Sequence, residues 1–174
     1  MHQSLMKMLD GYKAFREKYA SGDQSVLFNL SEQGQKPKIM VIACCDSRVD
    51  PALLVSAKPG DIFVERNVAN VVPNRDDGPN SILIALEVAL CGFQVKDIVI
   101  LGHQKCAGVQ MLACNTLHTF GDVPVEYRKR EQALQNTIAL KYDETNAGIF
   151  EKLNLSMSCD NLLSHDIVSS RLAS

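Results

Sequence analysis

The chain has 174 residues, of which 46% are hydrophobic and 22% are charged, and its formal net charge at pH 7 is -2. Its length fits one domain with a buried core, and its composition is that of a globular protein. The near-neutral charge excludes the basic field that attracts nucleic acid, so we expect no nucleic-acid partner. No apolar run approaches the roughly 18 residues of a membrane helix, and the N-terminus lacks a signal or transit pattern. These features predict a cytoplasmic protein without a membrane partner.

The predicted elements alternate between strands and helices along the chain. Short runs rich in β-branched residues predict buried strands over 38–44, 62–67 and 97–102. Helical segments are predicted over 5–19, from Pro51, over 79–93 with Gly92 as the C-terminal stop, and from about 126 onward. We therefore predict a single α/β domain with a central, mostly parallel sheet of about four strands, flanked by helices.

Three parts can be distinguished within this single domain of residues 1–174. Residues 1–35 form an N-terminal helical arm, whose apolar residues recur three and four apart and include Leu5, Met8, Tyr12, Phe15 and Tyr19. Residues 36–115 hold the predicted sheet and the candidate site described next. Residues 116–174 form a helical C-terminal part.

Two loops that follow predicted strands carry residue types that bind metals. Cys44 ends the first strand, and His103 and Cys106 follow the third. Ligands of parallel α/β sheets bind outside the carboxyl ends of the strands, so we expect these loops to converge. If the chain stays extended beyond Cys44, Asp46 points to the same side as Cys44 and Cys45 points away. The sequence therefore predicts a site of Cys44, His103 and Cys106, with Asp46 beside it.

The donor set of this site fits zinc better than magnesium or calcium, which prefer oxygen ligands. Three protein ligands leave the fourth tetrahedral position open for a water, whose pKa zinc lowers from about 15.7 to about 7. The Asp46 carboxylate would accept a hydrogen bond from that water. Arg48 would keep Asp46 ionised and oriented.

Each motif also has a purely structural interpretation when it is taken alone. A single cysteine after a buried strand packs more often than it binds metal. An Asp-Ser-Arg triplet more often forms a surface turn with an ion pair. The placement of both loops after parallel strands favours the metal site, and we predict packing roles for Cys45, Cys91, Cys114 and Cys159.

Three stretches of the sequence resemble the β-class carbonic anhydrases. They are Cys-x-Asp-Ser-Arg at 44–48, His-x-x-Cys at 103–106 and KPGDIFVERNVANVVP at 58–73. The resemblance implies one zinc ion per chain on Cys44, His103 and Cys106. It implies that Asp46 and Arg48 form the catalytic pair. The implied activity is reversible hydration of carbon dioxide to bicarbonate and a proton, by attack of zinc-bound hydroxide.

The same resemblance implies a substrate site for carbon dioxide and bicarbonate, and an assembly. Gln35 matches a substrate-binding glutamine that often reaches across a dimer interface. Phe63 and Val68 match apolar pocket positions, and the backbone amide of Ala107 matches one that contacts bound anions. We expect the N-terminal amphipathic helix to pack on a partner subunit in a homodimer or homotetramer.

Two departures from the family pattern lead to further expectations. The family's C-terminal strand near the sheet edge has no counterpart before Ser174, so we expect it to be missing. Members that close the aspartate onto zinc use a tryptophan in an effector pocket, and this chain has none, so we expect Asp46 to pair with Arg48. The alternatives to carbon dioxide hydration are a zinc hydrolase of carbonyl sulfide or carbon disulfide, and a truncated, non-catalytic subunit stabilised by zinc.

Overall fold

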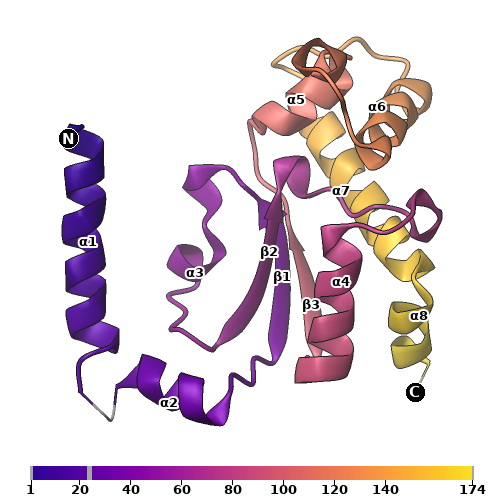
Figure 1. The fold of residues 1–174 in the computed structure, drawn as a ribbon. Helices are drawn as coiled ribbons and strands as arrows, with labels where there is room; N and C mark the ends of the chain where they lie inside the picture. The colour runs from indigo at the N-terminus through magenta and orange to yellow at the C-terminus, as the bar shows by residue number, and fades with distance from the viewer. Residues whose placement is uncertain (1, 23–24, 174) are drawn as a thin grey trace.

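A parallel sheet forms the centre of the computed structural model, which describes residues 2–22 and 25–173. Its strands are β1 (Ile39–Cys44), β2 (Ile62–Asn67) and β3 (Asp97–Leu101), in the order β2-β1-β3. Both neighbours run parallel to β1, which confirms the predicted α/β architecture (Figure 1). The described residues contain three strands, close to the expected four or so.

Helices surround the sheet and form most of the rest of the chain. They are α1 (Gln3–Tyr19), α2 (Val26–Gln33), α3 (Pro51–Leu54), α4 (Ser81–Glu87), α5 (Ala107–Ala113), α6 (Val125–Thr137), α7 (Ala147–Ser164) and α8 (Asp166–Leu172). Pro51 occupies the first turn of α3, where its missing N–H leaves no hydrogen bond unmade. Among the described residues, no helix is long and apolar enough to cross a membrane.

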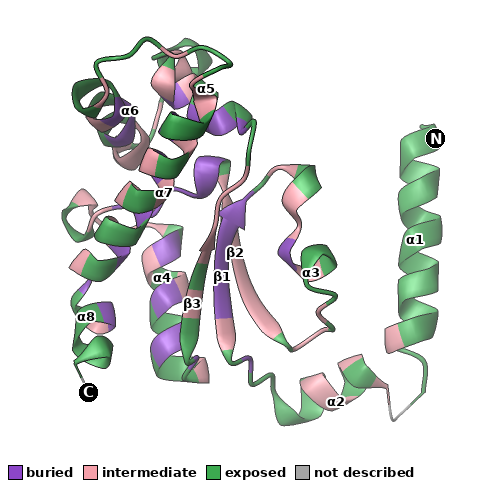
Figure 2. Cartoon of the chain, turned by 180° about the vertical axis from the view of Figure 1, so that it is seen from behind, coloured by how far each residue is buried: buried purple, intermediate pink, exposed green. Residues whose placement is uncertain are grey.

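The middle strand is the most deeply buried element (Figure 2). Residues from Met40 to Cys44 are all buried, because β1 has a paired strand on each side. Met40 and Ile42 pack with Leu86 of α4 and Leu162 of α7 in one apolar cluster. A second cluster gathers around the carboxyl ends of the strands, and it includes Cys44, Cys106, Val109 and Phe150.

The helix predicted over 79–93 ends differently from the prediction. The α-helix stops at Glu87, and Val88–Phe93 continue as a wider π-helical turn. The turn ends at Gln94, whose φ of 56° is left-handed, and not at Gly92. Gly92 was therefore the wrong stop, because a polar residue takes the conformation for which glycine is usually needed.

The N-terminal arm extends away from the sheet (Figure 1). Helix α1 has no buried residue, and its apolar side chains are exposed, including Leu5, Met8, Leu9, Tyr12 and Phe15. Helix α2 was not predicted, and it begins at Ser25, whose hydroxyl accepts a hydrogen bond from the Phe28 amide. Leu30 of α2 fits closely over Gly60, where a Cβ would lie 2.8 Å from its Cδ2 atom. Helix α2 thus contacts the turn that leads into β2.

Candidate metal centre

The carboxyl end of the sheet brings the three predicted ligands together. Cys44 is the last residue of β1, His103 follows β3, and Cys106 immediately precedes α5. The Sγ atoms of Cys44 and Cys106 lie 3.8 Å apart. One ligand atom from each of the three residues lies within 4.8 Å of the others. The convergence expected for parallel strands therefore occurs, and the group is compact enough to hold one metal ion.

The approach of α5 to the site depends on Gly108. A Cβ on this residue would lie 2.7 Å from Val68 Cγ1 and 3.0 Å from Ala69 Cβ. Ala69 itself has a left-handed φ of 62° in the turn Val68–Asn70. Only glycine lets the first turn of α5 pack this closely against that turn, and so keeps Cys106 near Cys44.

The two thiols share one proton in the absence of a metal. Hydrogen bonding from Cys106 and from the backbone amides of Asp46 and Ala69 together lowers the pKa of Cys44 to about 4, although burial opposes the shift. The same interaction and burial raise the pKa of Cys106 above its usual range. A divalent cation in place of this proton would favour both thiolates, as metal binding to cysteine requires.

His103 is held in the tautomer that a metal ligand needs. Its Nδ1 atom lies 3.0 Å from the carbonyl oxygen of Gln104. A carbonyl only accepts, so Nδ1 carries the proton and Nε2 keeps its lone pair. Nε2 is buried and has no hydrogen-bond partner among the described residues. A buried acceptor without a partner beside two thiols fits zinc, which prefers sulfur and nitrogen ligands.

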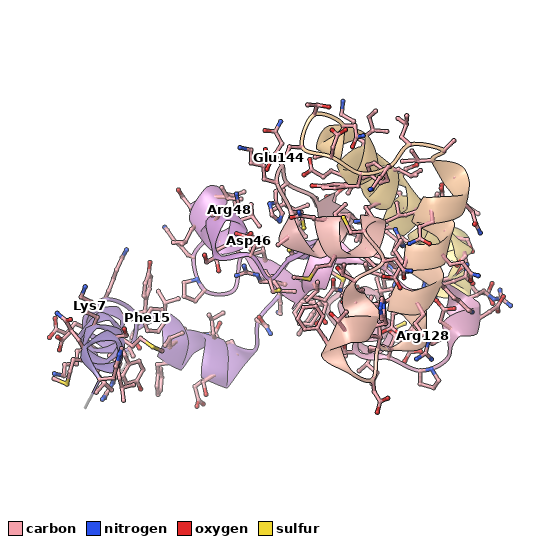
Figure 3. The ribbon with its side chains drawn as sticks, turned by 90° about the horizontal axis from the view of Figure 1, so that it is seen from above. Lys7, Phe15, Asp46, Arg48, Arg128 and Glu144 are labelled. Atoms are coloured by element: carbon pink, nitrogen blue, oxygen red, sulfur yellow. The ribbon has the colours of Figure 1, made fainter. Side chains whose placement is uncertain are left out.

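Asp46 and Arg48 form a bidentate ion pair next to the cluster (Figure 3). Arg48 donates from Nε to Asp46 Oδ1 over 3.0 Å and from Nη2 to Oδ2 over 2.8 Å. The Arg48 amide donates to the same carboxylate. These bonds hold the pKa of Asp46 well below its usual range, so it is ionised at neutral pH. Asp46 is paired with Arg48, as expected.

Comparison with known proteins agrees with this geometry. The family profile described as carbonic anhydrase matches residues 39–174. The chain belongs to the carbonic anhydrase family. A carbonic anhydrase of Synechocystis is 29% identical over 97% of this chain and 63% of its own length. The chain thus spans less than two thirds of that relative.

Further comparisons identify the β class within the family. Beta carbonic anhydrase 5 of Arabidopsis thaliana, named chloroplastic, is 39% identical over 60% of this chain and 35% of its own length. The structure of the β-carbonic anhydrase CcaA has a TM-score of 0.82 and 30% identity, covering 98% of this chain and 78% of that one. A Coccomyxa β-carbonic anhydrase shares the fold, with a TM-score of 0.77 at 24% identity over 99% and 77% of the two chains. Zinc is the metal of this class, and the cluster offers it suitable ligands.

The four residues predicted to bind substrate lie at two different ends of the sheet. Val68 and Ala107 lie at the carbonic anhydrase metal centre, since Val68 contacts the start of α5 and Ala107 follows Cys106. Phe63 pairs with Met40 near the amino ends of the strands, and its ring packs against that of Phe93. Gln35 precedes β1, whereas Cys44 ends it. Gln35 and Phe63 therefore do not join the metal centre of their own chain.

Arg66 is a residue of the site that the motifs did not reveal. From β2 it donates Nε to the Cys44 carbonyl over 3.0 Å and Nη2 to the Asp46 carbonyl over 2.8 Å. Its Nη1 binds the Asp50 carboxylate at 2.6 Å. Arg66 thereby holds the backbone of the predicted ligand Cys44 and of Asp46. The available signal was a cation in a partly buried strand, where a charge needs partners.

The remaining cysteines lie outside the metal centre. Cys45 is not part of the metal-binding group, which agrees with the prediction that its side chain points away from that of Cys44. Cys45 is exposed, however, and does not pack in the core. Cys91, Cys114 and Cys159 are exposed as well. The predicted packing roles were therefore wrong for this chain, because residue type alone does not determine which side chains face the core.

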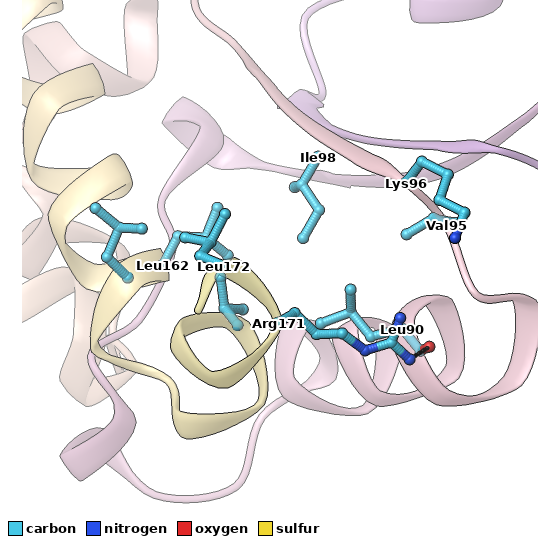
Figure 4. A pocket seen from close by; sticks show the side chains of 9 residues that line it. Leu90, Val95, Lys96, Ile98, Leu162, Arg171 and Leu172 are labelled. Atoms are coloured by element: carbon cyan, nitrogen blue, oxygen red, sulfur yellow. Dashed lines mark hydrogen bonds between the residues drawn. The ribbon is translucent and has the colours of Figure 1, made fainter. Parts of the chain in front are cut away.

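A cavity of about 370 Å³ lies apart from the metal centre (Figure 4). Apolar side chains dominate its lining, among them Leu90, Ile98, Leu162 and Val168. Arg171, which also lines it, donates to the Leu90 carbonyl over 2.7 Å and so joins α8 to the π-helical turn. None of the lining residues belongs to the Cys44, His103 and Cys106 group.

Proposed function

We propose that this chain is a zinc-dependent carbonic anhydrase that hydrates carbon dioxide reversibly to bicarbonate and a proton. The observation that carries the proposal is the buried Nε2 of His103, which has no hydrogen-bond partner among the described residues and belongs to a compact group with two thiols, beside an ionised carboxylate. Membership of the family supports it.

Each residue of the site has a distinct role in this proposal. Cys44 and Cys106 bind the zinc as thiolates, and His103 binds through Nε2. Zinc supplies the Lewis acidity that makes a water nucleophilic near neutral pH. Asp46 is ionised and accepts a hydrogen bond from the reacting water, which orients a lone pair toward carbon dioxide. Arg48 occupies both Asp46 oxygens and so limits the directions in which the carboxylate can turn.

The substrate pocket requires more than one chain in this proposal. Val68 and the amide of Ala107 would face carbon dioxide and bicarbonate from the chain that holds the metal. Gln35 and Phe63 lie toward the amino ends of the strands, away from the metal centre of their own chain, so they would come from a second copy. The exposed apolar face of α1 supports such an assembly, with α1 packed on the partner. A Sordaria macrospora relative of the same fold is described as tetrameric, and we propose a homodimer or homotetramer.

We also propose a division of the chain into three parts and a cellular location. One is the division into an arm over 1–35, a zinc-site core over 36–115 and a helical part over 116–174. The other is a cytoplasmic location. Arabidopsis thaliana relatives are named chloroplastic and mitochondrial, so fractionation of the native host is the direct test.

The deciding experiment is stopped-flow hydration of carbon dioxide against pH, on protein whose zinc content has been measured. We expect about one zinc per chain and a hydration rate that rises with pH. One zinc per chain without hydration at pH 8 and above would contradict the proposal and favour a non-catalytic, zinc-stabilised subunit. Turnover of carbonyl sulfide or carbon disulfide without carbon dioxide hydration would replace the substrate.

A further inference from the structure

One peptide group next to the metal centre has charged partners on both sides. The carbonyl of Lys105 accepts a hydrogen bond from Arg48 Nη2 over 2.9 Å. The amide of Cys106, which belongs to the same peptide group, donates to Glu151 Oε1 over 3.2 Å. A guanidinium and a carboxylate thus bind opposite ends of one peptide dipole, and both bonds are charge-assisted. Two such bonds through one polarisable group strengthen each other.

The backbone on either side of this peptide needs support. Lys105 has a left-handed φ of 53°, which residues other than glycine rarely adopt. Cys106 precedes α5 as its N-cap residue and makes no side-chain capping bond. The carboxylate of Glu151 therefore satisfies an amide at the helix start that the local sequence leaves without a partner.

Helix α7 supports the ligand loop at both ends. Glu151 reaches Cys106 at the end of the loop. One turn later, Leu155 packs where a Cβ on Gly102 would lie 3.6 Å from its methyl groups. Gly102 immediately precedes His103, so two successive turns of one helix face support the segment that carries two predicted zinc ligands.

We propose that Glu151 is a positioning residue for the catalytic pair. Its carboxylate orients the Lys105–Cys106 peptide, and the carbonyl of that peptide holds Arg48 on Asp46. Glu151 acts through this peptide and touches neither substrate nor zinc. The inference rests on the proposed function for its kinetic consequence, while the hydrogen-bond chain itself can be tested without turnover.

The test compares three variants of the zinc-loaded chain. Glu151→Leu removes the acceptor, and Glu151→Gln keeps an acceptor oxygen but removes the charge. Glu144→Leu is the matched control, because Glu144 is exposed and precedes α7, so this variant removes the same charge without affecting the Cys106 amide. The measurements are zinc content, kcat and KM for hydration, and the NMR signals of the Cys106 amide and the Arg48 Nε–H group.

We expect Glu151→Leu to shift the Cys106 and Arg48 signals and to lower kcat about tenfold, with KM and zinc content unchanged. Glu151→Gln should recover most of kcat, and Glu144→Leu should match the wild type. In an Arg48→Ala background, Glu151→Leu should cost little more, because both changes break the same chain of bonds. Additive losses there would indicate a merely structural role and overturn the proposal.

Two other outcomes would also overturn it. One is an unchanged Arg48 signal in Glu151→Leu, and the other is an equal effect of Glu144→Leu, which would indicate a general charge effect. If Glu151→Leu does not fold, Glu151→Gln decides, since the Cys106 and Arg48 signals must still move together. If the wild type hydrates no carbon dioxide, the proposed function fails, and the NMR signals alone still decide the role of Glu151.

Discussion

The carboxyl end of the sheet and the N-terminal arm differ in burial: the first buries its thiols, whereas the second exposes its apolar side chains. At the sheet end, Cys44 is 4% exposed and Cys106 is 2% exposed, and hydrogen bonds join them to β2 and α7. In the arm, α1 buries no residue, and Met8 is 70% exposed. The candidate metal centre is thus assembled within one chain, whereas the described part of that chain buries no residue of α1. Metal binding and assembly should therefore respond to different substitutions.

The largest expected effect separates the two adjacent cysteines. Cys44→Ser should lose zinc and carbon dioxide hydration, because one of only three ligands is removed. Cys45→Ser should keep both, because Cys45 is exposed and outside the metal-binding group. Zinc content and stopped-flow hydration measure the pair. Zinc loss in the Cys45 variant would show that the wrong thiol has been assigned.

The next effect separates metal binding from chemistry at the sheet end. Asp46→Asn should retain zinc, since Asp46 is not in the ligand group, and its hydration rate should fall about 100-fold, as for loss of a positioned proton acceptor. Zinc quantification and kcat measured on the same sample test this. An unchanged kcat would remove Asp46 from the mechanism.

Substitutions in the arm should change assembly and leave the metal in place. Leu9→Glu combined with Phe15→Glu should weaken association by roughly 3–6 kcal/mol, the transfer free energy of two buried apolar side chains. Sedimentation velocity should show a smaller particle with unchanged zinc content, and Lys7→Glu serves as a control on the same helix. An unchanged particle size would mean that α1 does not hold the subunits together.

Two glycines test the contrast in packing directly. Gly108→Ala should lower the free energy of unfolding by about 1–3 kcal/mol, because its methyl group would meet Val68 and Ala69. Gly11→Ala, in α1, meets nothing within 4 Å and should be neutral or stabilise the helix by up to about 1 kcal/mol. Denaturant unfolding of both variants measures the difference. Equal effects would contradict the contrast between the two regions.

The smallest effect is the pH dependence of the Asp46–Arg48 pair. Arg48 lowers the pKa of folded Asp46 below its unfolded value of about 3.9, so the stabilisation is complete above that pH. It declines as the pH falls from there toward the folded pKa. In metal-free protein, the stability difference between the wild type and Asp46→Asn should shrink between pH 7 and pH 3, measured by denaturant unfolding. A difference that grows would reverse the assigned sign.

The parts of the site that depend on local chain geometry were predictable from the sequence. Parallel strands place Cys44 and His103 at one sheet edge, and Cys106 follows His103 within the same short turn. Arg66 and Glu151 were not predictable, because each reaches the site from an element distant in the sequence. At the site both bind backbone groups, which leave no recognisable pattern of side chains in the sequence.

The fold was predictable to a similar degree and for similar reasons. Strand runs were recognised because β1 is buried on both faces and is therefore continuously apolar. Helix α2 was missed because its eight residues show only two helical turns of periodicity. The stop residue of the helical segment that continues from α4 was wrong because Gln94, and not Gly92, takes the left-handed conformation. Which residues would contact a second chain does not follow from the packing within one chain.

Position 104 is suitable for a reporter group because His103 forms its hydrogen bond with the main-chain carbonyl of Gln104. The imidazole is oriented by the main chain of its neighbour, so the side chain at position 104 contributes nothing to that orientation. Gln104 is also exposed. A fluorescent or spin-labelled residue at position 104 would therefore lie one residue from a predicted zinc ligand without changing how His103 is held.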